Sequence, residues 1–259
     1  MNIIQAIILS IVEGVTEFLP ISSTGHLVLA SNLLNIPQTP FVKSFEIFIQ
    51  LGAILAVFSL YWKTLFTQKN IWRTLFIAFL PTLVVGFLFY PVIKGFLIGN
   101  SFLTTLMLFL GGVLLIFIEY KYLASHKVRI NLSTLSAQQS FLIGVVQSFS
   151  VVPGVSRAAA TIFGGIFIGL SRKEAVLFSF LLAVPTMMAA TGYDLFKSGF
   201  YFSMNEFTLL AIGFFGSFMT AYLTMKYFLR YIAHHTFIPF GVYRIVLAIA
   251  FWMYLFKWE

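Results

Sequence analysis

The sequence contains no cysteine and very little charge. Of its 259 residues 9% are Asp, Glu, Lys or Arg, whereas a soluble domain has roughly 25%. The lack of cysteine excludes a disulfide scaffold, and the scarcity of charge excludes a water-soluble globule. Apolar residues make up 60% of the chain, which also excludes a disordered protein. The composition therefore predicts an all-α polytopic membrane protein with a single integral membrane domain, residues 1–259.

Acidic residues are the scarcer charge, with 8 Asp and Glu against 16 Lys and Arg. Six apolar stretches are long enough to cross a bilayer: Phe45–Trp62, Thr74–Ile93, Phe102–Ile118, Ala175–Tyr193, Phe207–Met225 and Phe237–Tyr254. The segments on one side of these stretches hold Lys63, Lys69, Arg73, Lys121, Lys127, Arg129, Arg172, Lys173, Lys226 and Arg230. The other side holds Lys43, Lys94, Lys197 and Lys257. This asymmetry predicts that the richer side is cytoplasmic, and we expect no nucleic-acid partner.

Two further apolar stretches, Met1–Ile36 and Gln139–Leu170, are interrupted near their middles. The alternation of charge holds if each stretch enters the membrane and returns on the same side, the first from outside and the second from the cytoplasm. We therefore predict six transmembrane helices plus two re-entrant helical hairpins, with both termini outside. A topology in which one of the two stretches crosses completely is the alternative.

The two interrupted stretches resemble each other. Gln5 aligns with Gln139, and Pro20-Ile-Ser-Ser23 aligns with Pro153-Gly-Val-Ser156 after one deletion. One hairpin and three crossings per copy require the second copy to be inverted in the membrane. The pattern predicts two inverted-topology repeats, approximately 1–120 and 135–257, with a site between them at the midplane. Generic similarity between apolar segments is the alternative explanation.

The first interruption carries Glu13 and Glu17, four residues apart and so on one face of a helix. Two carboxylates this close should share a proton or a divalent cation, Mg²⁺ or Ca²⁺. A helix end exposed at the membrane interface is the alternative.

Pro20 predicts the start of a helix, because proline suits the first helical turn. The unpaired N–H groups of such a helix start are suited to binding phosphate. Ser23 and His26 lie three residues apart on this helix, which predicts a nucleophile–base pair. Ser22 lies at the same helix start, and the alternative to a functional role for it is an ordinary N-cap. The alternative to a catalytic role for His26 is a buried histidine with satisfied hydrogen bonds.

The second interruption repeats this arrangement, with Gly154, Ser156, Arg157 and Thr161 near a predicted helix start. Arg157 lies in an apolar segment, and a buried arginine is costly unless an anion meets it. The candidates are Glu13, Glu17 and a ligand phosphate, with a purely structural Arg–Glu bridge as the alternative. The remaining arginine of interest, Arg244, is expected to extend to the interface near the cytoplasmic end of the last span.

At these residues the chain resembles the bacitracin-resistance family of undecaprenyl-diphosphate phosphatases. The first family motif reads Glu13-Gly-Val-Thr-Glu17-Phe-Leu-Pro20-Ile-Ser22-Ser23-Thr-Gly-His26 here, and the second reads Pro153-Gly154-Val-Ser156-Arg157-Ala158-Ala-Ala-Thr161. Ala158 departs from the family, which often has Ser there. The resemblance covers nearly the whole chain.

The resemblance implies hydrolysis of undecaprenyl diphosphate to undecaprenyl phosphate and inorganic phosphate. This reaction recycles the lipid carrier for cell-wall synthesis and confers bacitracin resistance. The implied location is the bacterial cytoplasmic (inner) membrane, with the active site facing the periplasm. The catalytic residues would be Glu17, Ser23, His26 and Arg157. The substrate phosphate would be bound by Ser22, Gly154, Ser156, Arg157 and Thr161, and a metal would be bound by Glu13 and Glu17.

Two mechanisms stay open at this point. In the first, Ser23 attacks phosphorus while His26, together with Glu17, accepts its proton. In the second, water attacks directly with Glu17 as base. Two other classes of protein are also considered: a polyprenyl-phosphate flippase or transporter that uses the same anion pocket, and a scaffold subunit of a wall-synthesis complex. The expected partners are the polyprenyl diphosphate and the bilayer, and a homodimer is left open.

Overall fold

The computed structural model describes residues 1–97, 100–123, 130–198 and 202–258. Within these ranges the chain forms ten α-helices, joined by short π, 3₁₀ and turn segments. In chain order they are α1 (Ile3–Thr16), α2 (Ser23–Leu33), α3 (Pro40–Thr67), α4 (Lys69–Val92), α5 (Ser101–Leu123), α6 (Ala137–Ser148), α7 (Arg157–Ile168), α8 (Arg172–Ser198), α9 (Met204–Ile232) and α10 (Ile238–Trp258).

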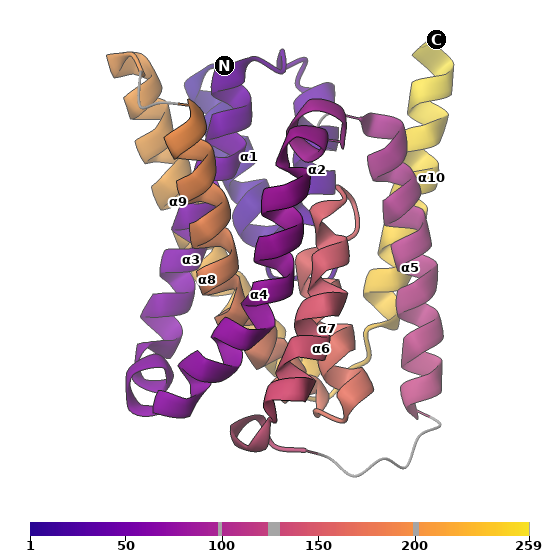
Figure 1. Ribbon diagram of the computed structural model, residues 1–259. Coiled ribbons are helices and arrows are strands. Elements are labelled where there is room, and N and C mark those ends of the chain that lie inside the picture. Colours follow the sequence, from indigo (N-terminus) through magenta and orange to yellow (C-terminus); the bar gives the residue numbers. More distant parts are fainter. Residues whose placement is uncertain (98–99, 124–129, 199–201, 259) are drawn as a thin grey trace.

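Six long helices run along the molecule in alternating directions: α3, α4, α5, α8, α9 and α10 (Figure 1). They coincide with the six apolar stretches of the sequence, so the prediction of these helices is confirmed. Five of them, all but α10, are long and apolar enough to cross a membrane. The apolar part of α10, Ile238–Tyr254, is shorter. The chain is thus an all-helical, multi-pass membrane protein.

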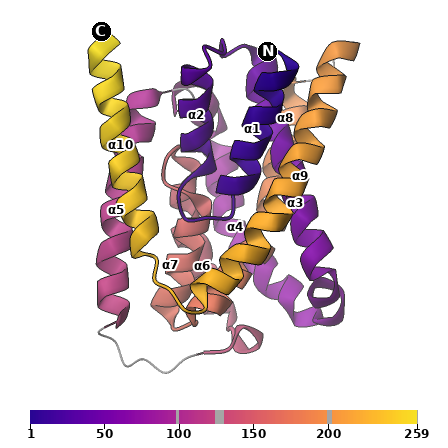
Figure 2. The ribbon, with the colours of Figure 1, turned by 180° about the vertical axis from the view of Figure 1, so that it is seen from behind.

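The other four helices form two short hairpins. The α1–α2 hairpin starts at the end of the molecule where both termini lie, and the α6–α7 hairpin starts at the opposite end (Figures 1 and 2). Each hairpin turns back near the middle of the bundle, so neither spans the full length of the long helices. The interruptions in the two apolar stretches are the turns of these hairpins.

The hairpins are built alike at both ends of their helices. Each begins with a capping box, in which Asn2 pairs with Gln5 and Ser136 pairs with Gln139. This gives the Gln5–Gln139 alignment a structural reason. At the turns, the second helices are capped by Ser22 and Ser156. The structure therefore matches Ser156 with Ser22, one residue away from the pairing with Ser23 in the sequence alignment.

Each hairpin packs against a helix from the other half of the chain. Helix α1 packs on α9, and α6 packs on α4. Glycines permit both contacts, because a Cβ at Gly14 would lie 1.9 Å from Thr220 Oγ1 and one at Gly144 would lie 2.1 Å from the Ala78 carbonyl oxygen. Helix α3 packs on α8, and α5 packs on α10. These contacts join the two halves into one body.

The basic residues lie at the two ends of the bundle as the sequence predicts. The richer group lies near the ends where α3 joins α4 and where α8 begins (Figure 1). Lys127 and Arg129, which belong to this group, lie outside the described residues. At the same end Arg172 forms an ion pair with Glu119, which is 1% exposed.

Candidate functional site

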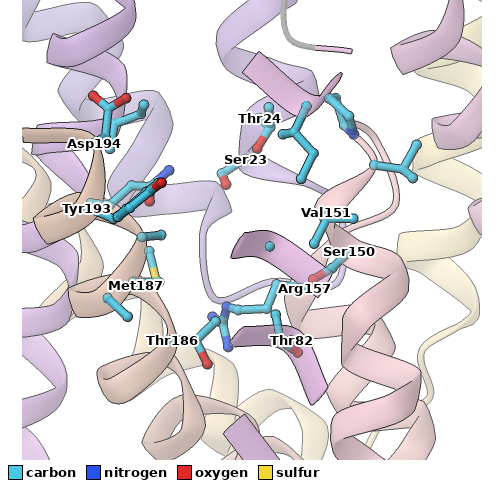
Figure 3. A pocket seen from close by; sticks show the side chains of 18 of the residues that line it. Ser23, Thr24, Thr82, Ser150, Val151, Arg157, Thr186, Met187, Tyr193 and Asp194 are labelled. Carbon is cyan, nitrogen blue, oxygen red and sulfur yellow. The ribbon is translucent and has the colours of Figure 1, made fainter. Parts of the chain in front are cut away.

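The turns of the two hairpins meet at a cavity of about 460 Å³. Part of its lining comes from the two turns and the helix starts after them, namely Glu17, Ser22, Ser23, Thr24, Gly154, Ser156 and Arg157. Further polar side chains come from the long helices, namely Gln50, Thr82, Tyr90, Thr186, Tyr193 and Asp194. Much of its remaining wall is apolar and comes from α4 and α8, including Leu83, Phe87, Met187 and Ala190. Figure 3 shows Ser23 and Arg157 entering the cavity from different hairpins, with Tyr193 and Asp194 of α8 on another side. The cavity is therefore polar where the hairpins meet, and along α4 and α8 its wall mixes apolar side chains with a few polar ones.

The helices after the turns begin later than the prolines predict. Helix α2 begins at Ser23 and α7 at Arg157, so Pro20 and Pro153 lie in the turns and not in the first helical turns. The reason is the backbone of Ser22 and Ser156, which both have φ of 72°, a left-handed value that a helix does not accept.

From this conformation each serine caps the helix that follows it. The Ser22 Oγ accepts a hydrogen bond from the Gly25 N–H at 3.3 Å, and the Ser156 Oγ accepts one from the Ala159 N–H at 3.1 Å. The N-cap role considered for Ser22 is thus present. Non-glycine residues with positive φ are uncommon and concentrate at functional sites. Both helix N-termini lie at the cavity, where the first backbone N–H groups have no acceptor within their own helix.

Glu17 connects the two hairpins through its carboxylate. Its Oε2 accepts a hydrogen bond from the Ser23 hydroxyl, and its Oε1 accepts two from Arg157, from Nε at 3.3 Å and from Nη2 at 3.2 Å. All three side chains are at least nine-tenths buried. Of the three anions considered for Arg157, the structure thus provides Glu17.

Arg157 is fixed by two further contacts. Its Nη1 donates to the carbonyl of Ser179 on α8 at 2.8 Å, and its guanidinium lies 5.8 Å from the centre of the Phe18 ring. These bonds use three of the five N–H donors that a guanidinium carries. Because Arg157 lines the cavity, its other donors are available to an anion there.

Glu13 lies one helical turn before Glu17 and is fully buried. Neither of its carboxylate oxygens has a hydrogen-bond partner among the described residues. A buried carboxylate without a donor is costly, so this group is suited to carrying a proton or holding a cation. It is not among the residues that line the cavity.

His26 does not pair with Ser23, and this part of the sequence interpretation is wrong. The imidazole Nδ1 lies 2.7 Å from the Ser22 carbonyl oxygen, and Nε2 lies 2.8 Å from the Tyr243 hydroxyl on α10. The rings of His26 and Tyr243 are stacked. Both ring nitrogens are therefore engaged away from Ser23, whose hydroxyl is bonded to Glu17. Spacing of three residues places two side chains on one helix face but does not set their direction.

Thr161 also lies elsewhere than the motif predicts. It is fully buried, and its hydroxyl contacts the Ser179 hydroxyl at 2.6 Å and the carbonyls of Arg157 and Ala158. Thr161 is not among the described residues that line the cavity. Its contacts join α7 to α8, so it supports the helix that carries Arg157.

Arg244 is the residue whose position the sequence reasoning missed. It is fully buried, and its guanidinium donates to backbone carbonyls, including those of Pro20 and Gly154 in the two turns. The expectation that it extends to the interface is wrong. The available signal was a charged residue in the middle of an apolar stretch, which marks a functional position in a membrane.

The described residues contain no group of three or more His, Asp or Glu side chains arranged to hold a metal ion. Both Glu17 oxygens already carry protein donors, whereas both Glu13 oxygens are free of them. Of the pair predicted to bind a metal, Glu13 is therefore the one whose oxygens carry no protein donor.

Fold and site together define a polytopic helical membrane protein with a cavity, lined by Ser23, Glu17 and Arg157, where two half-length hairpins meet. The family model described as "Bacitracin resistance protein BacA" matches residues 6–250. The chain therefore belongs to this family, as the motifs in its sequence indicate.

Curated relatives extend the same comparison. An "Undecaprenyl-diphosphatase" of Aquifex aeolicus is 51% identical over 247 residues, covering 95% of this chain and 96% of the relative. A protein of the same name from Sulfurihydrogenibium is 49% identical, and the match covers 98% of this chain and 100% of the relative. One from Thermus thermophilus is 45% identical, and the match covers 94% of each.

Proposed function

We propose that this protein is an undecaprenyl-diphosphatase, which hydrolyses undecaprenyl diphosphate to undecaprenyl phosphate and inorganic phosphate. The reaction recycles the lipid carrier of cell-wall synthesis, and an excess of enzyme confers resistance to bacitracin. The observation that carries the proposal is the buried Ser23–Glu17–Arg157 chain of contacts at the junction of the hairpins. It combines a hydroxyl nucleophile, a base and an anion-binding guanidinium in one cavity.

The chemistry follows from the order of these contacts. Ser23 Oγ attacks the terminal phosphorus, its proton passes to the Glu17 carboxylate, and the bond between that phosphorus and the bridging oxygen breaks. Undecaprenyl phosphate leaves, and water then attacks the phosphoserine to release inorganic phosphate and restore the hydroxyl. Arg157 and the N–H groups at the starts of α2 and α7 hold the phosphate oxygens, where charge increases in the transition state. In this assignment Glu17 takes the role that spacing alone gives to His26, because Glu17 accepts the Ser23 hydrogen bond.

The cavity wall favours an amphipathic substrate. The phosphates fit beside Ser23, Ser156 and Arg157, while the apolar side chains of α4 and α8 offer a surface to the first isoprene units. Ser22 and Gly154 also line the cavity.

The direct attack of water with Glu17 as base remains the second mechanism. The two are separated by rapid quench of the enzyme with substrate, followed by mass spectrometry. Phosphorylated Ser23 supports the serine mechanism, whereas substantial turnover by Ser23→Ala refutes it. Phosphate release by the purified protein from undecaprenyl diphosphate in detergent tests the activity itself.

A transporter is the competing function, since the half-length hairpins resemble the interrupted helices of transporters. A carrier needs charge matching but no nucleophile, and the Ser23–Glu17 contact favours the enzyme. Purified protein that moves the lipid across vesicles and releases no phosphate would establish the transporter instead.

We also infer a membrane topology of six crossings and two re-entrant hairpins, with the halves 1–120 and 135–257 as inverted repeats. The reciprocal packing of α1 on α9 and α6 on α4 supports it. The positive-inside rule then places both termini, and the cavity end near Tyr90 and Asp194, on the periplasmic side of the cytoplasmic membrane. Because the chain has no cysteine, single cysteines at Gln38 and Gln68 test this. An impermeant maleimide should label Gln38→Cys in intact cells and leave Gln68→Cys unlabelled.

The cation and the homodimer remain predictions. If Mg²⁺ or Ca²⁺ binds, Glu13 and Glu17 are the residues expected to hold it, since carboxylate oxygens are the ligands these ions prefer.

A further inference from the structure

Arg244 has an unusual environment for a charged residue. It lies on α10, is fully buried, and is the largest side chain that the structure buries completely. Its guanidinium makes hydrogen bonds to five backbone carbonyl oxygens and so uses all five of its N–H donors. With no donor left, this arginine is not suited to binding a ligand, and a different role is needed to explain its position.

The five carbonyls come from three parts of the chain. Nη1 donates to Pro20 in the first turn at 3.2 Å and to Val155 in the second turn at 3.3 Å. Nη2 donates to Gly154 at 2.8 Å. The remaining two bonds go to Leu108 and Met107 of α5, at 3.2 and 3.1 Å. One side chain thus connects both hairpin turns to each other and to α5.

The guanidinium and the second turn pack so closely on α5 that only glycine fits at two neighbouring positions, Gly111 and Gly154. A Cβ at Gly111 of α5 would lie 2.1 Å from Arg244 Nη2. Gly154, with φ of 92°, lies so close to α5 that a Cβ there would be 2.3 Å from the Thr104 carbonyl oxygen. The second turn and the arginine are therefore held in one arrangement.

We propose that Arg244 is a positioning residue, which holds the two hairpin turns in the register that places Ser23 opposite Arg157. The proposal rests on the phosphatase function proposed above. The carbonyl of Val155 belongs to the same peptide group as the N–H of Ser156, and in a trans peptide these two groups point in opposite directions. The cation on the carbonyl side therefore directs the Ser156 N–H away from itself and strengthens it as a donor. Both effects favour binding of phosphate oxygens in the transition state.

The test compares Arg244→Gln and Arg244→Lys with Arg172→Gln. Arg172 serves as a control, because its guanidinium is also bonded to a buried partner, the carboxylate of Glu119, but lies at the opposite end of α8 from the cavity mouth. We expect Arg244→Gln to lower kcat about 100-fold, as a misplaced catalytic group does, and to weaken inhibition by orthovanadate in parallel. Arg244→Lys, with three donors in place of five, should retain more activity than Arg244→Gln. Arg172→Gln should lower the thermal midpoint and leave kcat and the vanadate inhibition near wild type.

Hydrogen–deuterium exchange gives a readout that does not depend on turnover. In Arg244→Gln we expect faster exchange in both turns, residues 17–24 and 152–158, and in Arg172→Gln in neither. If the wild type releases no phosphate but exchange becomes faster in both turns of Arg244→Gln, the proposed function fails and the positioning role stands. A folded Arg244→Gln with wild-type kcat, vanadate inhibition and exchange overturns the positioning role.

Gly111→Ala keeps the proposal testable if Arg244→Gln does not fold. The added methyl group forces the guanidinium to move, so we expect a loss of kcat like that of Arg244→Lys. Gly192→Ala is its control, because a Cβ at Gly192 has no atom within 4 Å among the described residues. Wild-type kcat in Gly111→Ala contradicts the proposal.

Discussion

Glu17 combines a structural and a chemical role, and the two can be separated by substitution. Glu17→Ala leaves Arg157, with 9% of its side chain exposed, without its counter-ion. Breaking a buried ion pair by removing one partner costs about 3–5 kcal/mol. Glu17→Gln retains an oxygen for Arg157 and an amide near Ser23, so its loss of stability should be smaller. It removes the base, however, and general-base catalysis contributes about 10²–10⁴-fold to the rate.

The expected result for Glu17→Gln is a kcat lowered about 10²–10⁴-fold in a protein that still folds. The assay is phosphate release from undecaprenyl diphosphate in detergent, with thermal unfolding measured on the same samples. Glu119→Gln is the matched control, because Glu119 is equally buried and pairs with Arg172 away from the cavity. It should lower stability and leave kcat near wild type. A folded Glu17→Gln that turns over at close to the wild-type rate would refute the assignment of Glu17 as the base.

Three further predictions concern the surroundings of this site. Tyr243→Phe removes the hydroxyl that contacts His26 Nε2. Because His26 does not contact Ser23, kcat should fall far less than in Glu17→Gln. A loss as large as that of Glu17→Gln would show that His26 carries the proton. Gly14→Ala places a methyl group 1.9 Å from a threonine hydroxyl of α9 and should destabilise the protein by about 1–3 kcal/mol, whereas Gly192→Ala should be neutral or stabilising in thermal unfolding. Chelation should abolish phosphate release and Mg²⁺ or Ca²⁺ should restore it if Glu13 holds a cation, and activity that survives thorough chelation removes the metal from the mechanism.

The sequence predicted the helices well because the bilayer imposes a strict rule on them. A stretch of apolar residues in lipid must satisfy its backbone internally, which only a helix of sufficient length does. The two interrupted stretches could be recognised for the same reason, since Glu13, Glu17 and Arg157 are costly in lipid. Gln5 and Gln139 could be aligned because both hairpins start with the same local cap.

The errors of the sequence reasoning have a common cause. The positions of His26, Thr161 and Arg244 depend on partners far away in the chain: His26 on Tyr243, Thr161 on Ser179, and Arg244 on both turns. Spacing along one helix determines which side chains lie on the same face, but contacts with the neighbouring helix decide where each side chain points. The late start of α2 and α7 is a subtler case, because proline favours a first helical turn while the positive φ of the serine caps delays it.

The sequence by itself determined that this is a membrane protein, where its helices run, and which few charges lie where lipid makes them costly. Local backbone rules and the hydrophobic requirement of the bilayer suffice for that. Only the tertiary structure decided that Ser23 is bonded to Glu17, that Arg157 reaches Glu17 across 140 residues of chain, and that Arg244 connects the two turns. These contacts join halves of the chain that no local rule relates, so they exist only once the hairpins have packed against each other.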